Sequence, residues 1–202
     1  MRIHAKLLLL MCTPLCAAAD RPAITQEVAT ATLPLPAFMR DGAAVVRLDA
    51  AGVPMPVRPG NNGMVCIADR PGDDHLDVRC YSKDFIAVVY RAFQLRRKAG
   101  NSGASAGDTI EAEIKAGTLH LPDRPTAGYR CEGPIKAYDA AANTYRPPVH
   151  CWQSIHFPYR TAAEIGLPDE SQLTAAQMKS LPYVMSSGKY WAHVMIEHPD
   201  QK

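Results

Sequence analysis

The sequence predicts an α+β domain in which an antiparallel sheet packs against one long helix, with shorter helical turns and two disulfides. Three observations predict it. Short apolar segments separated by turn residues recur along the chain and indicate strands. Residues 83–98 carry a long helical pattern of apolar side chains. Cysteines in an even number follow the leader segment, which in an exported chain indicates disulfide bonds.

Residues 1–19 have the pattern of a secretory signal peptide. Arg2 and Lys6 form a basic leader, an apolar run from Leu7 to Ala19 follows, and alanines at 17–19 offer small side chains for cleavage. The run is shorter than the roughly 20 residues that a membrane span requires. We therefore expect an exported protein, periplasmic or extracellular, with no transmembrane segment.

The charge balance argues against nucleic-acid binding. The chain has 22 lysines and arginines against 20 acidic residues, and the leader holds Arg2 and Lys6 but no acid. The processed chain is therefore formally neutral, whereas nucleic-acid binding usually requires a basic face. The one dense basic cluster, at 96–98, lies at the predicted end of a helix, where cations favour the helix dipole.

The domain is expected to follow an extended arm. Residues 20–40 are rich in alanine, threonine and proline and predict this arm, and residues 41–202 predict a single α+β domain. A hairpin is expected at 43–59, with Pro54 and Pro56 restricting its second strand to a sheet edge. A turn at 60–63 and strands at 64–69 and 77–82 follow.

The longest expected helix covers residues 83–98, with Ser82 as its cap. Glycine and serine predict a flexible loop at 100–107, and Asp108 is expected to cap a short helix at 109–116. The remaining expected elements are strands at 128–139 and 149–159, helical turns at 160–168 and 174–181, and a final strand at 189–198.

Four cysteines remain after the leader, and they allow three pairings that sequence alone does not separate. We favour Cys66–Cys80 and Cys131–Cys151, because each bond would join two neighbouring predicted strands. In the chain-entropy description each would stabilise the fold by roughly 3 kcal/mol. A structural zinc site is the competing interpretation, but the chain contains no C-x-x-C pair.

Three stretches, "NGMVCIADRPGDD", "CWQSIHFPYRTAAEIGLPDE" and "PYVMSSGKYWAHVMIEHP", carry a resemblance. They resemble an uncharacterised family of exported bacterial hypothetical proteins, over about residues 40 to 199. The resemblance implies an exported bacterial protein. It carries over no activity and no functional residues.

The stretch from 64 to 82 includes four aspartates between two cysteines: Asp69, Asp73, Asp74 and Asp77. Calcium binds six to eight oxygen ligands, so these carboxylates are candidate calcium ligands. The EF-hand spacing is absent, however, and "PGDD" is ordinary turn composition. We therefore expect a disulfide-closed hairpin whose acids mostly face water.

Histidines supply the second candidate site. Alternation along a strand places His193 and Glu197 on one face. His156, on a strand that could pair with the last one, is the best further partner, and the three could bind zinc or act as a base and its orienter. The competing interpretation makes both histidines hydrogen-bonded residues of apolar strands. Ser186 and Ser187 lie near His193 in sequence, but no G-x-S-x-G motif surrounds them.

Two functions follow as hypotheses. The leading one is a disulfide-stapled binding or structural module, since the chain has no catalytic motif and no cofactor fingerprint. The alternative is a metal-assisted, hydrolase-like enzyme built on His156, His193 and Glu197. The enzyme predicts the two histidine side chains within about 5 Å of each other in a pocket, with a carboxylate nearby. The module predicts them apart or enclosed by apolar neighbours.

Overall fold

The structure is a computed structural model that describes residues 24–70, 72–98, 104–139, 141–142, 144–146 and 148–197. The signal peptide expected at residues 1–19 lies outside these ranges. Among the described residues, no helix is both long and apolar enough to cross a membrane.

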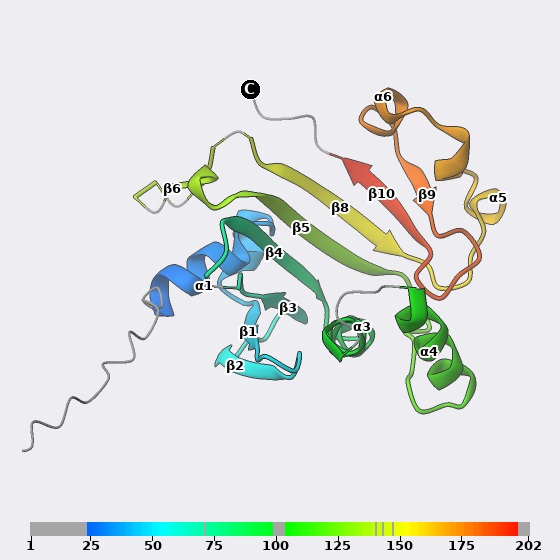
Figure 1. The fold of residues 1–202 in the computed structure, drawn as a ribbon. Coiled ribbons are helices and arrows are strands. Elements are labelled where there is room, and N and C mark those ends of the chain that lie inside the picture. Colours follow the sequence, from blue (N-terminus) through cyan, green and yellow to red (C-terminus); the bar gives the residue numbers. More distant parts are fainter. Residues whose placement is uncertain are drawn as a thin grey trace, which may run out of the picture.

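A mixed sheet of eight strands forms the centre of the protein, in the order β2-β1-β3-β4-β5-β8-β10-β9 (Figure 1). Strands β6 and β7 form a separate pair. The strand bounds are β1 Ala44–Leu48, β2 Pro54–Arg58, β3 Met64–Ile67, β4 His75–Ser82, β5 Thr126–Pro134, β6 Tyr138–Asp139, β7 Thr144–Tyr145, β8 His150–His156, β9 Tyr183–Met185 and β10 His193–Glu197.

The sheet is not purely antiparallel as expected, because β1 and β3 run parallel. The turn at 60–63 causes this: the backbone N–H groups of Asn61 and Asn62 donate to the carbonyl of Gly42, just before β1. The chain leaving β2 therefore passes the start of β1 and enters β3 in the same direction. A Cβ on Gly60 would lie 2.1 Å from the backbone nitrogen of Ala44, so only glycine fits this close crossing.

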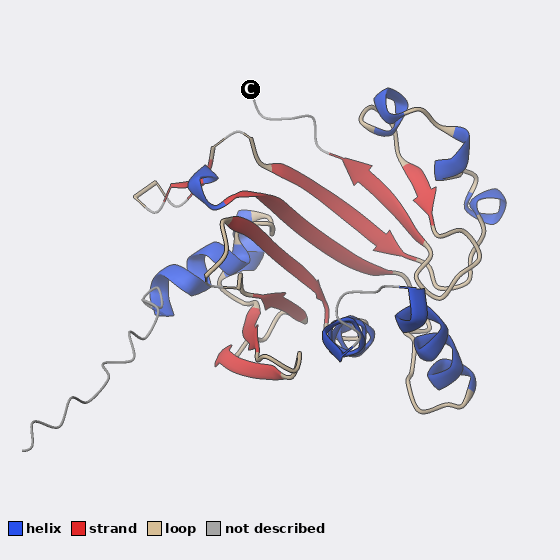
Figure 2. Ribbon diagram, viewed as in Figure 1, coloured by secondary structure: helices blue, strands red, loops and turns tan. Residues whose placement is uncertain are grey.

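Two helices, rather than one, are long. The helices are α1 Ile24–Thr32, α2 Ala37–Arg40, α3 Ile86–Lys98, α4 Ala104–Lys115, α5 Ala162–Ile165 and α6 Ala175–Met178. Helices α3 and α4 lie near the ends of β4 and β5, whereas α5 and α6 lie beside β9 (Figure 2). Helix α3 confirms the helix expected at 83–98, although it begins at Ile86, about one turn later than expected.

Helix α4 begins at Ala104, so the loop expected at 100–107 was too long and Asp108 lies inside the helix instead of capping it. Packing explains the difference. Ala106 and Ile110 are buried, and Ile110 belongs to the apolar cluster around Phe85 and α3. Tertiary burial thus overrides the weak helix propensity of serine and glycine.

The described part of the N-terminal stretch, residues 24–40, is not an extended arm but contains α1 and α2. Ala31 and Leu35 are almost fully buried and pack with Val45 and Cys66 of the sheet. Glu27 of α1 also forms an ion pair with Arg47 of β1. The stretch is therefore part of the core, which threonine and proline content alone does not reveal.

The two faces of the sheet differ, and we name each by its residues. The disulfide face carries Cys66, Cys80, Cys131 and Cys151, and α1 packs on part of it. The histidine face carries Tyr81, His156 and His193, and Phe85 and the following helix α3 pack on part of it.

Both favoured disulfides are present, Cys66–Cys80 and Cys131–Cys151. Each joins residues that lie directly opposite on adjacent antiparallel strands. Their Cα atoms are 3.9 and 4.2 Å apart. The bonds lock the register of β3 on β4 and of β5 on β8, the strands at the centre of the sheet.

Each edge of the sheet has a feature that disfavours pairing with a further strand. Strand β2 is an edge strand, as its prolines predict. The carbonyl of Val53 faces β1, so by alternation the positions of Pro54 and Pro56 face outward and offer no N–H group. At the opposite edge Val184 of β9 donates its N–H to Pro168.

The C-terminal third departs from expectation in its strands. The last strand begins at His193 rather than at 189, and β7 and β9 were not expected as strands. The strand expected at 128–139 is interrupted after Pro134 by a 3-10 turn at Ile135–Ala137, and β6 follows it as a separate strand. The helical turn expected at 160–168 is confirmed as α5, with Thr161 capping its start and Gly166 ending it at a φ of 79°. A left-handed residue is the usual end of such a turn.

Candidate functional site

Side chains on the histidine face stand in successive rows, because directly opposite residues of neighbouring strands point the same way. The first row crosses β5, β8, β10 and β9 and consists of Thr126, His156, His193 and Met185. The structure thus brings the predicted His156 and His193 together, as direct partners with ring centroids 5.0 Å apart.

Three aromatic rings surround His156 of this pair. The ring of Phe85 stacks on His156 at 4.3 Å between centroids, and Trp191 meets it edge-on at 5.3 Å. Tyr81 lies 5.8 Å away. His156 and His193 are 2% and 6% exposed. Sequence analysis missed these aromatic neighbours, since Phe85 and Trp191 lie just outside strands and their contacts with His156 are long-range.

Hydrogen bonds hold one nitrogen of each ring. Nδ1 of His193 lies 2.8 Å from the carbonyl oxygen of Trp191, and since a carbonyl only accepts, Nδ1 carries the hydrogen. Nε2 of His156 lies 3.2 Å from Oγ of Ser154. Among the described residues, the buried side-chain polar atoms without a hydrogen-bond partner are Nδ1 of His156 and Oγ1 of Thr126. Both belong to the first row.

Burial keeps the two histidines neutral. It lowers the pKa of His156 to about 3, with a further lowering from the neighbouring His193. Burial also lowers the pKa of His193, against a raising effect from the Trp191 carbonyl and the charge of Glu170. Neutral imidazoles can accept a proton or bind a metal through the nitrogen that carries no hydrogen.

Glu197 shares the face of His193 but not its surroundings. It stands four residues further along β10, opposite Trp152, a separation of about 13 Å. Its carboxylate accepts a hydrogen bond from Tyr183 at 3.2 Å and lies 3.6 Å from Nε2 of His150. Among described residues, no three side chains of histidine, cysteine, aspartate or glutamate are grouped to hold a metal ion.

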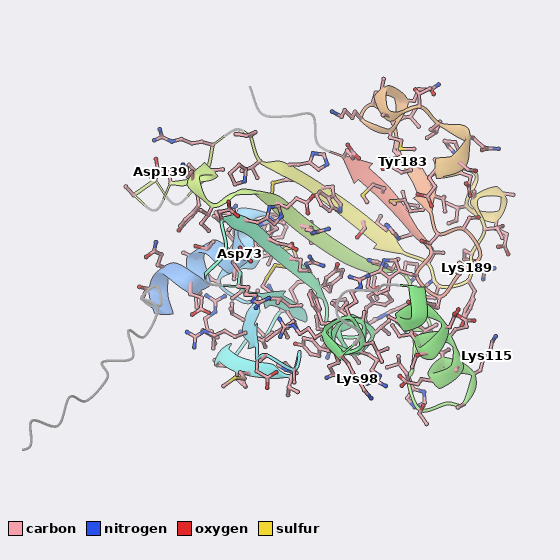
Figure 3. All side chains as sticks on the ribbon, in the orientation of Figure 1. Asp73, Lys98, Lys115, Asp139, Tyr183 and Lys189 are labelled. Atoms are coloured by element: carbon pink, nitrogen blue, oxygen red, sulfur yellow. A yellow bond between two sulfur atoms is a disulfide. The ribbon has the colours of Figure 1, made fainter. Side chains whose placement is uncertain are left out.

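The four aspartates of the candidate calcium loop differ in their exposure and in their hydrogen-bond partners. Asp73, labelled in Figure 3, accepts a hydrogen bond from the backbone N–H of His75 in an exposed turn. Asp74 is also exposed. Asp69 accepts from the backbone N–H of Asp77, and burial raises its pKa to about 6. Asp77 pairs with Arg79 and Arg130. Two of the acids face water as expected, and two are partly buried.

The serines before β10 are turn residues. Ser187 accepts a hydrogen bond through Oγ from the backbone of Ala162. Ser186 has a φ of 56° and donates its N–H to Glu170 at 3.0 Å. They tie the segment before β10 to α5 and to the 3-10 turn at Glu170–Gln172.

The second row of the histidine face consists of Tyr81, Gly128, Ser154, Met195 and Tyr183. A polar network that sequence analysis did not identify begins at Tyr183 and extends over the rows beyond it. The third row of the face consists of Arg79, Arg130, Trp152 and Glu197, and the fourth row consists of Asp77, Glu132 and His150. We define the polar network as Asp77, Arg79, Arg130, Glu132, His150, Trp152, Tyr183 and Glu197. Alternating polar residues in β4, β5 and β8 are the signal that could have revealed it.

Ion pairs and rings connect the polar network. Arg130 pairs with Asp77 and Glu132, and its guanidinium lies 4.8 Å from the ring centroid of Trp152. His150 lies 5.0 Å from the same ring and links it to Glu197. Tyr183, labelled on β9 in Figure 3, completes the network. Burial alone would raise the pKa of Asp77, but its arginine partners outweigh this and lower it.

A separate open groove of about 480 Å³ lies between α3, the chain after α4 and β2. Pro54, Tyr90 and Leu119 form apolar parts of its wall, and the ion pair of Arg91 with Glu113 also lines it.

A comparison of the chain with protein-family models, curated proteins and solved structures found no match.

Proposed function

We propose that the protein is an exported, disulfide-stapled binding module, and that the polar network on the histidine face is its ligand-binding surface. The observation that carries the proposal is the continuity of this network. Its side chains span β4, β5, β8, β10 and β9 through ion pairs, hydrogen bonds and the ring of Trp152, which lies between Arg130 and His150.

Rigidity supports a binding role. The network stands on the central strands of the sheet, whose registers are fixed by the two disulfides on the opposite face. Side chains held in this way lose little conformational entropy when they bind a ligand. Asp77, Arg130, Glu132 and His150 all keep part of their side-chain surface in solvent.

The chemistry of the network favours a saccharide. Three carboxylates stand beside two guanidinium groups and one histidine, so the surface has no strong net charge to attract an ionic ligand. Paired planar acceptors and donors can hydrogen-bond adjacent hydroxyl groups. Trp152 adds a ring against which the apolar face of a sugar can pack.

Export supports the same proposal. The leader at residues 1–19 is of the secretory type, and two disulfides are typical of proteins that mature in an oxidising compartment. The family resemblance points to a bacterial exported protein as well. Saccharide polymers are accessible ligands for a protein in that location.

The test is binding to a panel of soluble saccharides, with the wild-type protein and Trp152→Leu. We expect a retained saccharide whose affinity falls at least about tenfold in Trp152→Leu. Phe38→Leu is the matched control, because Phe38 is an exposed aromatic residue on α2, outside the network. Absence of any retained saccharide, or equal loss in both variants, would contradict the proposal.

The second candidate function is a metal-assisted hydrolase that uses His156, His193 and Glu197. The 5.0 Å spacing of the two histidine rings favours it, whereas the bonding of Glu197 to Tyr183 and His150 weighs against it. Zinc-dependent hydrolysis of chromogenic esters that disappears in His193→Ala but not in His150→Ala would support the enzyme over the binding module.

A further inference from the structure

We propose that the first row of the histidine face binds one soft monovalent ion, Cu(I), through Nδ1 of His156, Nε2 of His193 and the thioether sulfur of Met185. This site is independent of the polar network. It differs from the zinc site expected from sequence because Met185 takes the place of Glu197.

Strand register brings the three ligands together. His193 is the direct partner of His156 on β8 and of Met185 on β9. Directly opposite residues have Cβ atoms about 4.5–5.5 Å apart and point to the same face. The two imidazole rings lie 5.0 Å apart by centroid, and a methionine side chain is long and flexible enough to reach between neighbours.

Each ring has one nitrogen that makes no hydrogen bond in the pairs described above, Nε2 of His193 and Nδ1 of His156. The Trp191 carbonyl fixes the hydrogen of His193 on Nδ1, so its Nε2 carries the lone pair. Such a bond from the second ring nitrogen to a carbonyl is usual for metal-binding histidines. If Ser154 accepts from Nε2–H of His156, Nδ1 carries the lone pair there, and it is the buried atom that has no hydrogen-bond partner among described residues. That orphaned atom is the independent sign of a ligand.

Charge selects a monovalent ion. The three ligands are neutral, and the negative charge of Glu170 acts on His193. One carboxylate balances one positive charge, whereas a dication would leave an uncompensated charge in a buried setting. Thioether and imidazole ligands favour Cu(I) over harder ions, and the surrounding rings of Phe85 and Trp191 keep water away.

An access route exists at Met185. It belongs to the short edge strand β9 and is only partly buried, unlike the two histidines. An ion can therefore meet the sulfur first and then the imidazoles behind it.

The experiment titrates the processed, disulfide-bonded protein with Cu(I) under anaerobic, ascorbate-containing buffer, in competition with a chromophoric Cu(I) chelator. We expect one equivalent to bind. Met185→Leu should weaken binding at least about tenfold, since it removes only the soft ligand. Met195→Leu is the matched control, because Met195 stands on the same face one row away, opposite Ser154 and Tyr183; its affinity should not change.

A second measurement needs no substitution. With methionine methyl groups labelled by ¹³C, addition of silver nitrate, which supplies the redox-inert analogue Ag(I), should shift the Met185 methyl resonance and the His193 ring nitrogens together. The proposal is overturned if no 1:1 complex forms, if Met185→Leu and wild type bind equally, or if Zn(II) binds more tightly than Cu(I).

Discussion

Asp77 on β4 and Arg130 on β5 form two parallel hydrogen bonds, 2.9 and 3.0 Å long, although they are not direct cross-strand partners. The direct partners carry like charges: Arg79 faces Arg130, and Asp77 faces Glu132. Like charges directly opposite destabilise a sheet. The diagonal pair of Asp77 with Arg130 and the same-strand pair of Asp77 with Arg79 offset this repulsion, so this carboxylate joins the two strands at the polar network.

Removal of that carboxylate should therefore destabilise the sheet. Asp77→Asn removes the negative charge that pairs with Arg79 and Arg130, so these two directly opposite arginines repel each other more strongly. We expect the free energy of unfolding, measured with urea, to fall by about 1–3 kcal/mol. Glu132→Gln, which removes the more exposed acid, should cost less. An equal effect of the two substitutions would show that the diagonal pair has no special role.

The two disulfides should contribute unequally. Their loops span 14 and 20 residues, so chain entropy assigns each roughly 3 kcal/mol. Cys66 and Cys80 are fully buried against Ala31 and Leu35, however, and replacement by alanine also leaves a cavity there. We expect the double alanine variant at Cys66 and Cys80 to lose more stability in urea than the variant at Cys131 and Cys151. The reverse order would contradict this packing argument.

Local sequence patterns predict much of the fold. Strands at β3, β4, β5 and β8 and the helix α3 follow from period and turn residues. Each favoured disulfide joins neighbouring predicted strands. The parallel pairing of β1 with β3 is not predictable in this way, because it depends on a long-range crossing at Gly60. Helix α4 starts early because of burial rather than propensity.

The site shows the same division between local and long-range information. Alternation correctly places His193 and Glu197 on one face, and β8 does pair with β10 as expected. Glu197 is nevertheless distant from the two histidines, because it stands four residues beyond His193 on β10 and each residue of a strand adds about 3.3 Å. Met185 was not recognised because "PYVMSSG" has the composition of a turn, and only its pairing with β10 makes it a neighbour of His193.

The partly buried carboxyl of Asp69 gives a testable pH dependence. Because burial raises its pKa to about 6 from 3.8, the folded protein binds a proton more tightly than the unfolded chain. Its contribution to stability is therefore present below pH 4 and is lost as pH rises to about 6. Asp69→Asn keeps an oxygen to accept the hydrogen bond from Asp77 but does not titrate.

The measurement compares thermal unfolding of wild type and Asp69→Asn from pH 4 to pH 7. The wild-type protein should lose stability relative to the variant as pH rises through this window, whatever the other carboxylates contribute to both. Melting curves whose difference stays constant with pH would place the Asp69 carboxyl in an environment no different from water.

Two glycines should respond in opposite directions to alanine. At Gly60 a Cβ would meet the backbone of Ala43 and Ala44 at 2.1–2.7 Å, and backbone atoms cannot move aside without shifting β1. Gly107 lies inside α4, where a Cβ would have only the hydroxyl of Tyr190 nearby, at 4.0 Å. Gly107→Ala should therefore stabilise the protein by up to about 1 kcal/mol through helix propensity. Gly60→Ala should lower the melting temperature clearly, and a neutral result there would mean that the crossing between β2 and β3 is not as close as the structure shows.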